Sequence, residues 1–278
     1  MGYICPLCQQ ALSQDKTQFF CPNNHHFDIA KEGYINLLPV QKKHSKDPGD
    51  NKEMMLARRA FLSSDHYLPM RDQVIAYLKT ATQSVMRPKI LDLGCGEGYY
   101  TQGMVTALDQ AQIYGLDISK VAIRYSAKRY HHIHFCVASN YSLPFAQNSF
   151  DAMVRIYAPC EHSEILRTLK PEGVLITVTP AARHLYQLKE LVYSDVHLHD
   201  NTPEEIPGLN LIQEKNLHYT MLLSGEEAEN LLQMTPFAWK ATPEVKRNLL
   251  NIKKIEVEAD FNIRLFSVSA EVSIKKEG

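Results

Sequence analysis

The sequence lacks any apolar run that approaches the length of a membrane-spanning helix. Such a helix needs about 20 predominantly apolar residues, and polar or charged side chains interrupt every apolar segment of this chain well before that length. The amino terminus is polar and carries paired cysteines, unlike a signal peptide. We therefore expect a soluble, cytoplasmic protein that does not associate with membranes.

The chain also has little net charge. Its 30 Lys and Arg residues against 31 Asp and Glu residues leave a formal net charge of -1 over 278 residues. This balance gives no chain-wide basic surface for nucleic acid, so any RNA-binding surface must be a local patch. With 45% hydrophobic residues, the chain is long enough to bury one large core and to carry a small appendage.

The six cysteines do not have the distribution of a secreted disulfide framework. Three of them are scattered and are expected to be small buried side chains: Cys95, Cys136 and Cys160. The other three form a cluster near the amino terminus: Cys5, Cys8 and Cys21. In a cytosolic chain such a cluster favours a metal site over disulfide bonds.

The amino-terminal cluster has the spacing of a zinc site. Cys5 and Cys8 share one tight turn, and Cys21 and His25 share another, so three thiolates and an imidazole can reach the corners of a tetrahedron. His26 is the alternative to His25, and reduced cysteines without metal are the alternative to a site. Because protein fills all four positions, we predict one structural zinc per chain, with no open position for catalysis.

The most informative segment is a short apolar strand, residues 89–93, that runs into three alternate glycines: Gly94, Gly96 and Gly98. Without Cβ atoms these residues keep the turn tight and let a ligand approach the backbone closely. The next residues, 100–108, have apolar side chains at helical spacing, so one helix face packs back on a sheet. Strand, glycine turn and helix together predict a seat for a nucleotide-sized ligand.

The segments that follow indicate which ligand this is. The next strand, 113–116, ends in Asp117 about 20 residues after the glycines, where a carboxylate can accept hydrogen bonds from both ribose hydroxyls. Later come Leu143-Pro144-Phe145, the strand 149–156, and residues 169–173 leading into the strand 174–178. In this order they resemble the motifs of class I methyltransferases, which implies S-adenosylmethionine as cofactor. A dinucleotide-binding fold, with its related G-x-G-x-x-G turn, is the alternative.

The order of elements predicts an α/β fold, a doubly wound Rossmann-like class I methyltransferase sheet with a small amino-terminal zinc-binding module. We assign residues 1–38 to a zinc-binding RNA-recognition module, 39–68 to a linker and 69–278 to the methyltransferase domain. The polar stretch 39–51 contains lysines that either grip phosphates or belong to a solvated connector.

A helical insertion is predicted late in the chain. Residues 225–251 are helical in composition, are broken by Pro236 and Pro243, and precede a last strand at 261–268. Phe237 and Trp239 either stack on a nucleobase or pack in a core. We expect them in the core.

Motifs along nearly the whole chain resemble the RlmA family of 23S rRNA guanine-N1-methyltransferases. They are the two cysteine turns, Lys31–Pro39, Asp47–Asp50, Ala57–Leu62, Arg155–Cys160 and Leu232–Trp239. The resemblance implies methyl transfer from S-adenosylmethionine to N1 of one guanine in a hairpin loop of 23S rRNA, with the zinc module helping to recognise RNA. It also implies cofactor contacts by Tyr67, Gly94, Gly96, Glu97, Gly98, Tyr99, Asp117 and His184.

Methylation at guanine N1 removes a proton, so a general base is expected. Glu161, His162 and Asp195 are candidates from their place in the sequence. At Ser139-Asn140 the chain departs from the general methyltransferase pattern, in which an acidic residue often meets the adenine amino group.

Two other functions stay open: methylation of a small metabolite, and RNA binding by a catalytically inactive zinc protein. The sequence leaves open whether the chain forms a homodimer.

Overall fold

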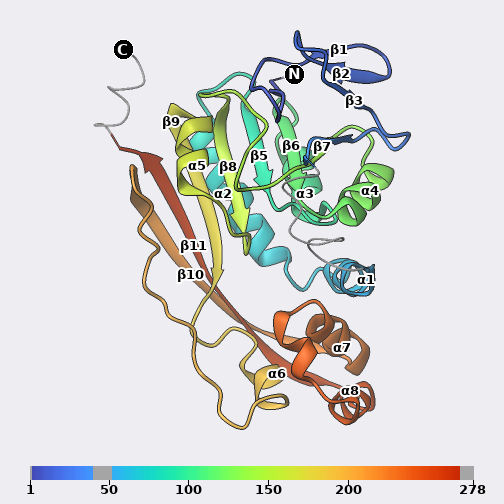
Figure 1. Ribbon diagram of the computed structural model, residues 1–278. Coiled ribbons are helices and arrows are strands. Elements are labelled where there is room, and N and C mark those ends of the chain that lie inside the picture. Colours follow the sequence, from blue (N-terminus) through green and yellow to red (C-terminus); the bar gives the residue numbers. More distant parts are fainter. Residues whose placement is uncertain (1, 40–51, 270–278) are drawn as a thin grey trace.

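An eight-stranded mixed sheet forms the frame of the protein, described by a computed structural model over residues 2–39 and 52–269 (Figure 1). Its strands are β4 (Ile35–Asn36), β5 (Lys89–Leu93), β6 (Gln112–Asp117), β7 (His134–Val137), β8 (Phe150–Ile156), β9 (Leu169–Pro180), β10 (Leu209–Leu223) and β11 (Ile255–Val268). They lie in the order β10-β11-β9-β8-β5-β6-β7-β4. Neighbours are parallel from β4 to β9, and β11 is antiparallel to both β9 and β10. The predicted α/β sheet is confirmed.

Helices connect and cover the parallel strands. They are α1 (Lys52–Leu62), α2 (Leu68–Thr82), α3 (Tyr99–Ala107), α4 (Lys120–Arg129), α5 (His162–Thr168), α6 (Tyr186–Glu190), α7 (Gly225–Gln233), the 3₁₀ helix η2 (Pro236–Lys240) and α8 (Pro243–Leu250). The central strand β5 is buried on both faces, because Ile90 joins one apolar cluster while Leu91 and Leu93 join the other. The carboxyl ends of the strands are therefore held rigidly.

The amino-terminal module has its own small antiparallel sheet but not its own core. The sheet consists of β1 (Ser13–Gln14), β2 (Gln18–Phe20) and β3 (His26–Asp28). The ring of Tyr3 contacts Phe19 within the module and Tyr114 and Phe145 in the main domain. The strand β4 extends the main sheet beside β7. A module this small buries too little apolar surface alone, so it shares the core of the main domain.

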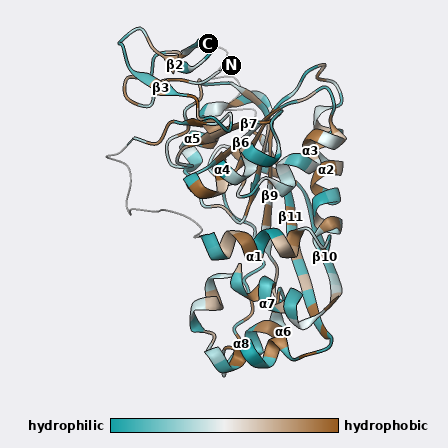
Figure 2. Cartoon of the chain, turned by 90° about the vertical axis from the view of Figure 1, so that its right-hand side faces the viewer, coloured by the Kyte–Doolittle hydropathy of each residue, from teal (hydrophilic) through white to brown (hydrophobic). Residues whose placement is uncertain are grey.

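The segment predicted as a linker, 39–68, is not irregular throughout. Residues 40–51 lie outside the described part of the chain, but 52–62 form α1, which buries Met55, Phe61 and Leu62. These apolar residues recur at helical spacing, which brings one face of α1 against α7. Figure 2 shows α1 between the sheet with its covering helices and the helices α6 to α8.

The predicted last strand and helical insertion are present. Strands β10 and β11 form a long antiparallel ladder, and α7, η2 and α8 lie between them in sequence. Phe237 is partly buried, but Trp239 is 74% exposed, so the expectation of a core position is wrong for the tryptophan. Its 3₁₀ helix is only five residues long and turns that side chain outward. Within the described residues, no helix has both the length and the apolarity to span a membrane.

Candidate cofactor site and metal centre

A cavity of about 1260 Å³ opens at the carboxyl ends of the parallel strands. The chain passes from β5 to β6 on one side, whereas β8 lies on the other, so the strand order reverses here. Ligands of open α/β sheets bind at such a switch point. Gly94 after β5, Asp117 at the end of β6, Tyr157 after β8 and Thr179 near the end of β9 all line it. Pockets for one small molecule typically measure 300–1000 Å³, so this cavity has room for a cofactor and a substrate group.

The glycine turn has one side closed by protein and one side open. Gly94 and Gly96 both have positive φ, +71° and +54°. A Cβ on Gly94 would lie 2.5 Å from the Cβ of Ala158, whereas a Cβ on Gly96 would meet nothing within 4 Å. Gly96 also lines the cavity. Gly94 is therefore needed for packing, and Gly96 leaves the space that a ligand can approach.

Substitutions of these two glycines should separate folding from binding. Gly94→Ala adds a steric clash to the cost of about 1–2 kcal/mol for a side chain at positive φ, so it should lower the melting temperature more than Gly96→Ala does. Gly96→Val should weaken S-adenosylmethionine binding while the protein stays folded, because its branched side chain fills the open face. Calorimetric titration and thermal denaturation of both proteins test this. Normal cofactor affinity in Gly96→Val would make the turn purely structural.

Asp117 joins the glycine turn to the cavity. Its Oδ2 accepts a hydrogen bond from the backbone N–H of Gly96 (2.9 Å), and its Oδ1 accepts one from the N–H of Ser119 (2.7 Å). A carboxylate oxygen can accept more than one hydrogen bond. Held in one orientation at the cavity lining, this side chain suits a ligand that carries hydroxyl groups.

Tyr67 and His184 meet at the opposite wall of the cavity. Both line it, and their ring centroids are 6.2 Å apart. The N–H of Asp260 donates to Nδ1 of His184 (3.2 Å), and burial lowers the pKa of His184 to about 3. The imidazole is therefore neutral with its proton on Nε2, which lies 3.4 Å from the hydroxyl of Tyr157. Tyr157 has a positive φ of +56°, a strained conformation that directs its ring to the cavity.

Three of the predicted cofactor residues do not line the cavity. Glu97 is 3% exposed beneath Arg129 (Oε2 to Nη1 3.4 Å), and burial raises the pKa of its carboxyl. The hydroxyl of Tyr99 donates to Asp65 (3.3 Å). Gly98 is the N-cap of α3, with φ +84°. After Gly96 the chain turns into α3, which takes these three residues out of the cavity lining. Tyr67, Gly94, Gly96, Asp117 and His184 are the predicted residues that the cavity brings together.

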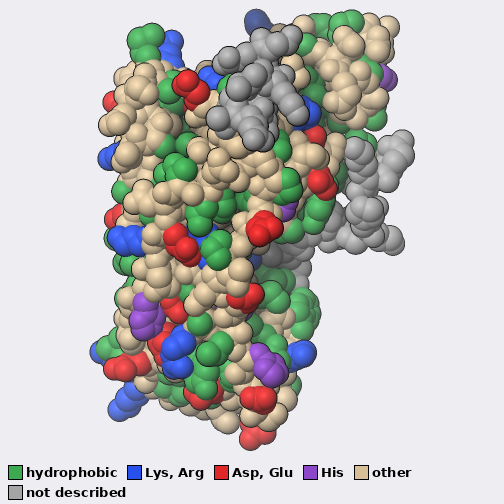
Figure 3. Space-filling view, turned by 90° about the vertical axis from the view of Figure 1, so that its left-hand side faces the viewer, with side chains coloured by type: hydrophobic (Ala, Val, Ile, Leu, Met, Phe, Trp, Pro, Cys, Tyr) green, Lys and Arg blue, Asp and Glu red, His purple; other side chains and the backbone are tan. Residues whose placement is uncertain are grey.

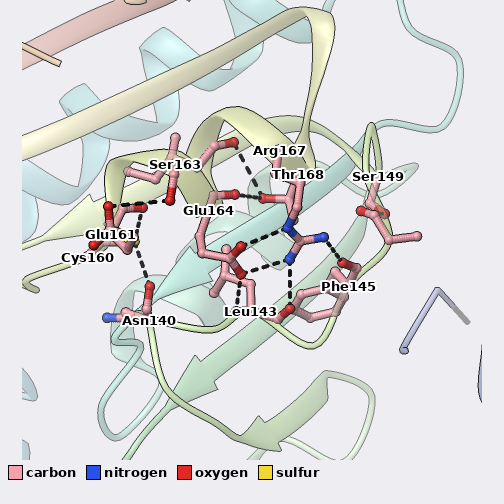
Figure 4. Close-up of polar contacts among 12 residues, drawn as sticks. Asn140, Leu143, Phe145, Ser149, Cys160, Glu161, Ser163, Glu164, Arg167 and Thr168 are labelled. Atoms are coloured by element: carbon pink, nitrogen blue, oxygen red, sulfur yellow. Dashed lines mark hydrogen bonds and ion pairs between the residues drawn. The ribbon is translucent and has the colours of Figure 1, made fainter. Parts of the chain in front are cut away.

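A partly buried ion pair holds the loop that follows Ser139 and Asn140, two residues of the cavity lining (Figure 4). Arg167 donates to both carboxylate oxygens of Glu164 (2.8 Å each) and to the carbonyl oxygens of Leu143 (2.9 Å) and Phe145 (2.6 Å). A planar guanidinium suits this multiple contact. The departure from the general methyltransferase pattern at 139–140 thus lies within the cavity lining, on a rigid loop.

The predicted zinc ligands come together. One ligand atom from each of Cys5, Cys8, Cys21 and His25 lies within 4.8 Å of all the others. Nδ1 of His25 is 3.4 Å from the sulfurs of Cys5 and Cys21, and the sulfurs of Cys8 and Cys21 are 3.6 Å apart. Zinc–sulfur bonds of 2.3 Å at tetrahedral angles require sulfurs about 3.8 Å apart. The donor set therefore fits zinc and leaves no fourth position for water.

His26, the alternative zinc ligand, points away from this cluster. Its Nδ1 lies 3.0 Å from Oε1 of Gln18 on the surface of the small sheet. His26 begins β3, and successive side chains of a strand face opposite sides. The structure therefore selects His25.

The three base candidates from the sequence are poorly placed. Glu161 and His162 do not line the cavity, and His162 Nε2 contacts Glu204 (2.9 Å). Asp195 lines the rim with its side chain 85% exposed. The sequence missed two contacts that do line the cavity, the ion pair of Arg155 with Glu204 and the contact of Lys189 with His199. Arg155 is on β8 and Lys189 on α6, but their partners Glu204 and His199 lie in the irregular connection between α6 and β10, where no periodicity indicates position.

Comparisons with known proteins agree with this architecture. Residues 3–46 match the family model described as RlmA, N-terminal, and residues 87–233 match the model described as methyltransferase domain. A "23S rRNA (guanine(748)-N(1))-methyltransferase" from Streptomyces fradiae is 28% identical over 245 residues, covering 86% of each chain. A "Putative 23S rRNA (guanine-N(1)-)-methyltransferase" from Micromonospora griseorubida is 29% identical, covering 86% of this chain and 87% of that one. Bacillus subtilis (strain 168) has one that is 27% identical, covering 94% and 95%.

Proposed function

The chain belongs to the methyltransferase domain family, and we propose that it transfers a methyl group from S-adenosylmethionine to N1 of a guanine in a hairpin loop of 23S rRNA. The observation that carries the proposal is the combination in one chain of a segment matching the RlmA amino-terminal model with a methyltransferase domain. Relatives named for this reaction align with 86% or more of this chain and of their own length.

The cavity residues suit S-adenosylmethionine. Asp117 would accept hydrogen bonds from the ribose hydroxyls, and Gly96 gives the open backbone face that close approach requires. Tyr67 and neutral His184 close the other wall without introducing a charge. When bound, the cofactor supplies a methyl group already activated by its sulfonium centre. The protein's own task is to align the acceptor and exclude water.

The rest of the cavity suits a nucleobase. Tyr141, Tyr157 and Phe237 line it, and aromatic rings of this kind stack on unpaired bases. Guanine N1 lies on the Watson–Crick edge, so the target must be in a loop or turned out of its stack before it can react. A hairpin loop is the RNA element that presents such a base.

The zinc module would act at a distance from the chemistry. Its metal site is closed, so it organises a surface and performs no reaction. In Figure 1 the module lies above the sheet, whereas α1 and α6, which contribute to the cavity, lie below. The module would therefore contact RNA away from the target base. On the face shown in Figure 3, acidic and basic side chains are interspersed, so we place the RNA on a different face.

Mass mapping of 23S rRNA from a strain that lacks the gene tests this function. We expect one guanine to lose a methyl group and to regain it when the gene is restored. An unchanged rRNA together with an altered small metabolite would favour the small-metabolite alternative. Failure of the purified protein to bind S-adenosylmethionine would favour an inactive RNA-binding protein.

We further propose that the protein acts in the cytoplasm. Light scattering of the pure protein tests whether it forms a homodimer.

A further inference from the structure

One lysine in the cavity is buried against a histidine. Lys189, on α6, is 8% exposed, and its Nζ lies 2.6 Å from Nε2 of His199. Both residues line the cavity that also contains Gly96 and Asp117. The backbone N–H of His199 donates to the carbonyl of Ala182 (3.1 Å), which holds the connection after α6 in place. Lysine is almost never this buried unless it is paired with an acid.

The described part of the chain offers Lys189 no such acid. Among the described residues, no carboxylate lies within ion-pair distance of the Lys189 ammonium. The titratable groups that face the pair are His184 before α6 and Asp260 on β11. Burial lowers the pKa of Lys189, and burial together with the lysine charge lowers the pKa of His199, against an opposing effect of Asp260. Burial without a paired carboxylate therefore makes the neutral amine easier to form here than on an exposed lysine.

Three other titratable groups that line the cavity already have hydrogen-bond partners. His184 uses the lone pair of Nδ1 for the N–H of Asp260 and holds its proton on Nε2. Glu204 is paired with Arg155 and His162, and these contacts hold its pKa below its ordinary value. Asp117 is oriented by the glycine turn, at the place assigned to the ribose. An amine of ordinary pKa is a stronger base than a carboxylate or an imidazole.

We propose that Lys189, held by His199, accepts the N1 proton of the target guanine. This proposal rests on the proposed function. The N1–H bond breaks and an Nζ–H bond forms, so the neutral amine becomes an ammonium ion. The electron pair left on N1 would form the bond to the methyl carbon of S-adenosylmethionine, while the bond from that carbon to the sulfonium sulfur breaks and its electron pair returns to the sulfur, which becomes neutral. His199 is a positioning residue, because it holds the amine without touching the substrate.

Two substitutions of Lys189 test this role. Lys189→Met keeps most of the stem and removes the amine, and Lys189→Arg keeps a positive donor that cannot lose its proton. Both should lower kcat by about 10²–10⁴-fold, the usual contribution of a general base. The exposed Lys128→Met on α4 is the matched control and should keep normal activity. Calorimetric affinity for S-adenosylmethionine shows that each variant keeps a folded cofactor site.

The dependence of the methylation rate on pH tests whether Lys189 acts as a base. A proton acceptor must be neutral, so the wild-type rate should rise with pH and level off above the pKa of Lys189. The rate of the variants should keep rising to higher pH than that of the wild type, because it depends on the ionisation of guanine N1 itself. Near-normal kcat in Lys189→Arg, with the wild-type pH profile, would overturn the proposal and assign the lysine a role as a positive charge.

A readout independent of methylation completes the test. The ¹³Cε resonance of Lys189, identified by its absence in the two variants, should titrate well below those of surface lysines in the protein without substrate. Titration at an ordinary lysine pKa would overturn the proposal. If the wild-type enzyme methylates guanine N1 and the Lys189 variants keep normal activity, the role of Lys189 as general base is rejected and the proposed function stands. Wild-type enzyme that leaves guanine N1 unmodified rejects the proposed function itself.

Discussion

Asp117→Ala should weaken S-adenosylmethionine binding at least about 100-fold, because two hydrogen bonds to a charged acceptor contribute about 3 kcal/mol or more. The carboxylate also orients the backbone N–H groups of Gly96 and Ser119, so part of the loss should come from a less ordered glycine turn. No apolar cavity opens, and the protein should stay folded. Calorimetric titration measures the affinity, and thermal denaturation measures the folding.

Asp117→Asn is the matched control for this prediction. It keeps the shape of the side chain and one acceptor oxygen but removes the charge. Its affinity should fall between that of the wild type and that of Asp117→Ala. Unchanged affinity in the alanine variant would contradict the assignment of Asp117 to the ribose.

Loss of the zinc should have the largest effect on stability. The purified protein should contain one zinc, and Cys8→Ser and His25→Ala should contain none, while His26→Ala, a substitution at the next residue, should keep it. Structural zinc binding in isolated fingers is worth about 10–16 kcal/mol. Elemental analysis of the three variants measures the metal content. A zinc-free wild type, prepared without chelator, would contradict the site.

The apolar core shared by the zinc module and the main domain determines how much of the protein is destabilised when zinc is lost. Tyr3 packs on Tyr114 and Phe145, and β4 pairs with β7, so removal of zinc should destabilise that edge of the main sheet as well as the module. Methylation of rRNA should still fall much more than cofactor affinity, since the cavity lies at the other end of the strands. Equal losses of both would show that the zinc supports the cavity itself.

The parts of the site that could be predicted from the sequence are formed by residues close to one another along the chain. Gly94, Gly96 and Asp117 follow directly from two apolar strands, because the residue after a parallel strand lies at the sheet edge wherever the chain goes next. The four zinc ligands likewise lie in two short turns. Only the choice between His25 and His26 needed the structure, which places His26 on the surface of β3.

Features that depend on distant contacts were not predictable in this way. The polar stretch before Asn51 suggested a linker up to residue 68, although Met55, Phe61 and Leu62 have the spacing of an amphipathic helix. The contact between Lys189 and His199 arises because an irregular connection folds back on α6. Neither residue belongs to a motif or a period, so no sequence pattern could bring them into the cavity.

The most direct test is incubation of the purified protein with unmodified 23S rRNA and S-adenosylmethionine carrying a labelled methyl group, followed by mapping of the label. The account predicts one labelled guanine in a hairpin loop, methylated at N1, and loss of that label with Asp117→Ala. Label at another position of the base, at many nucleotides or in no RNA at all would contradict it.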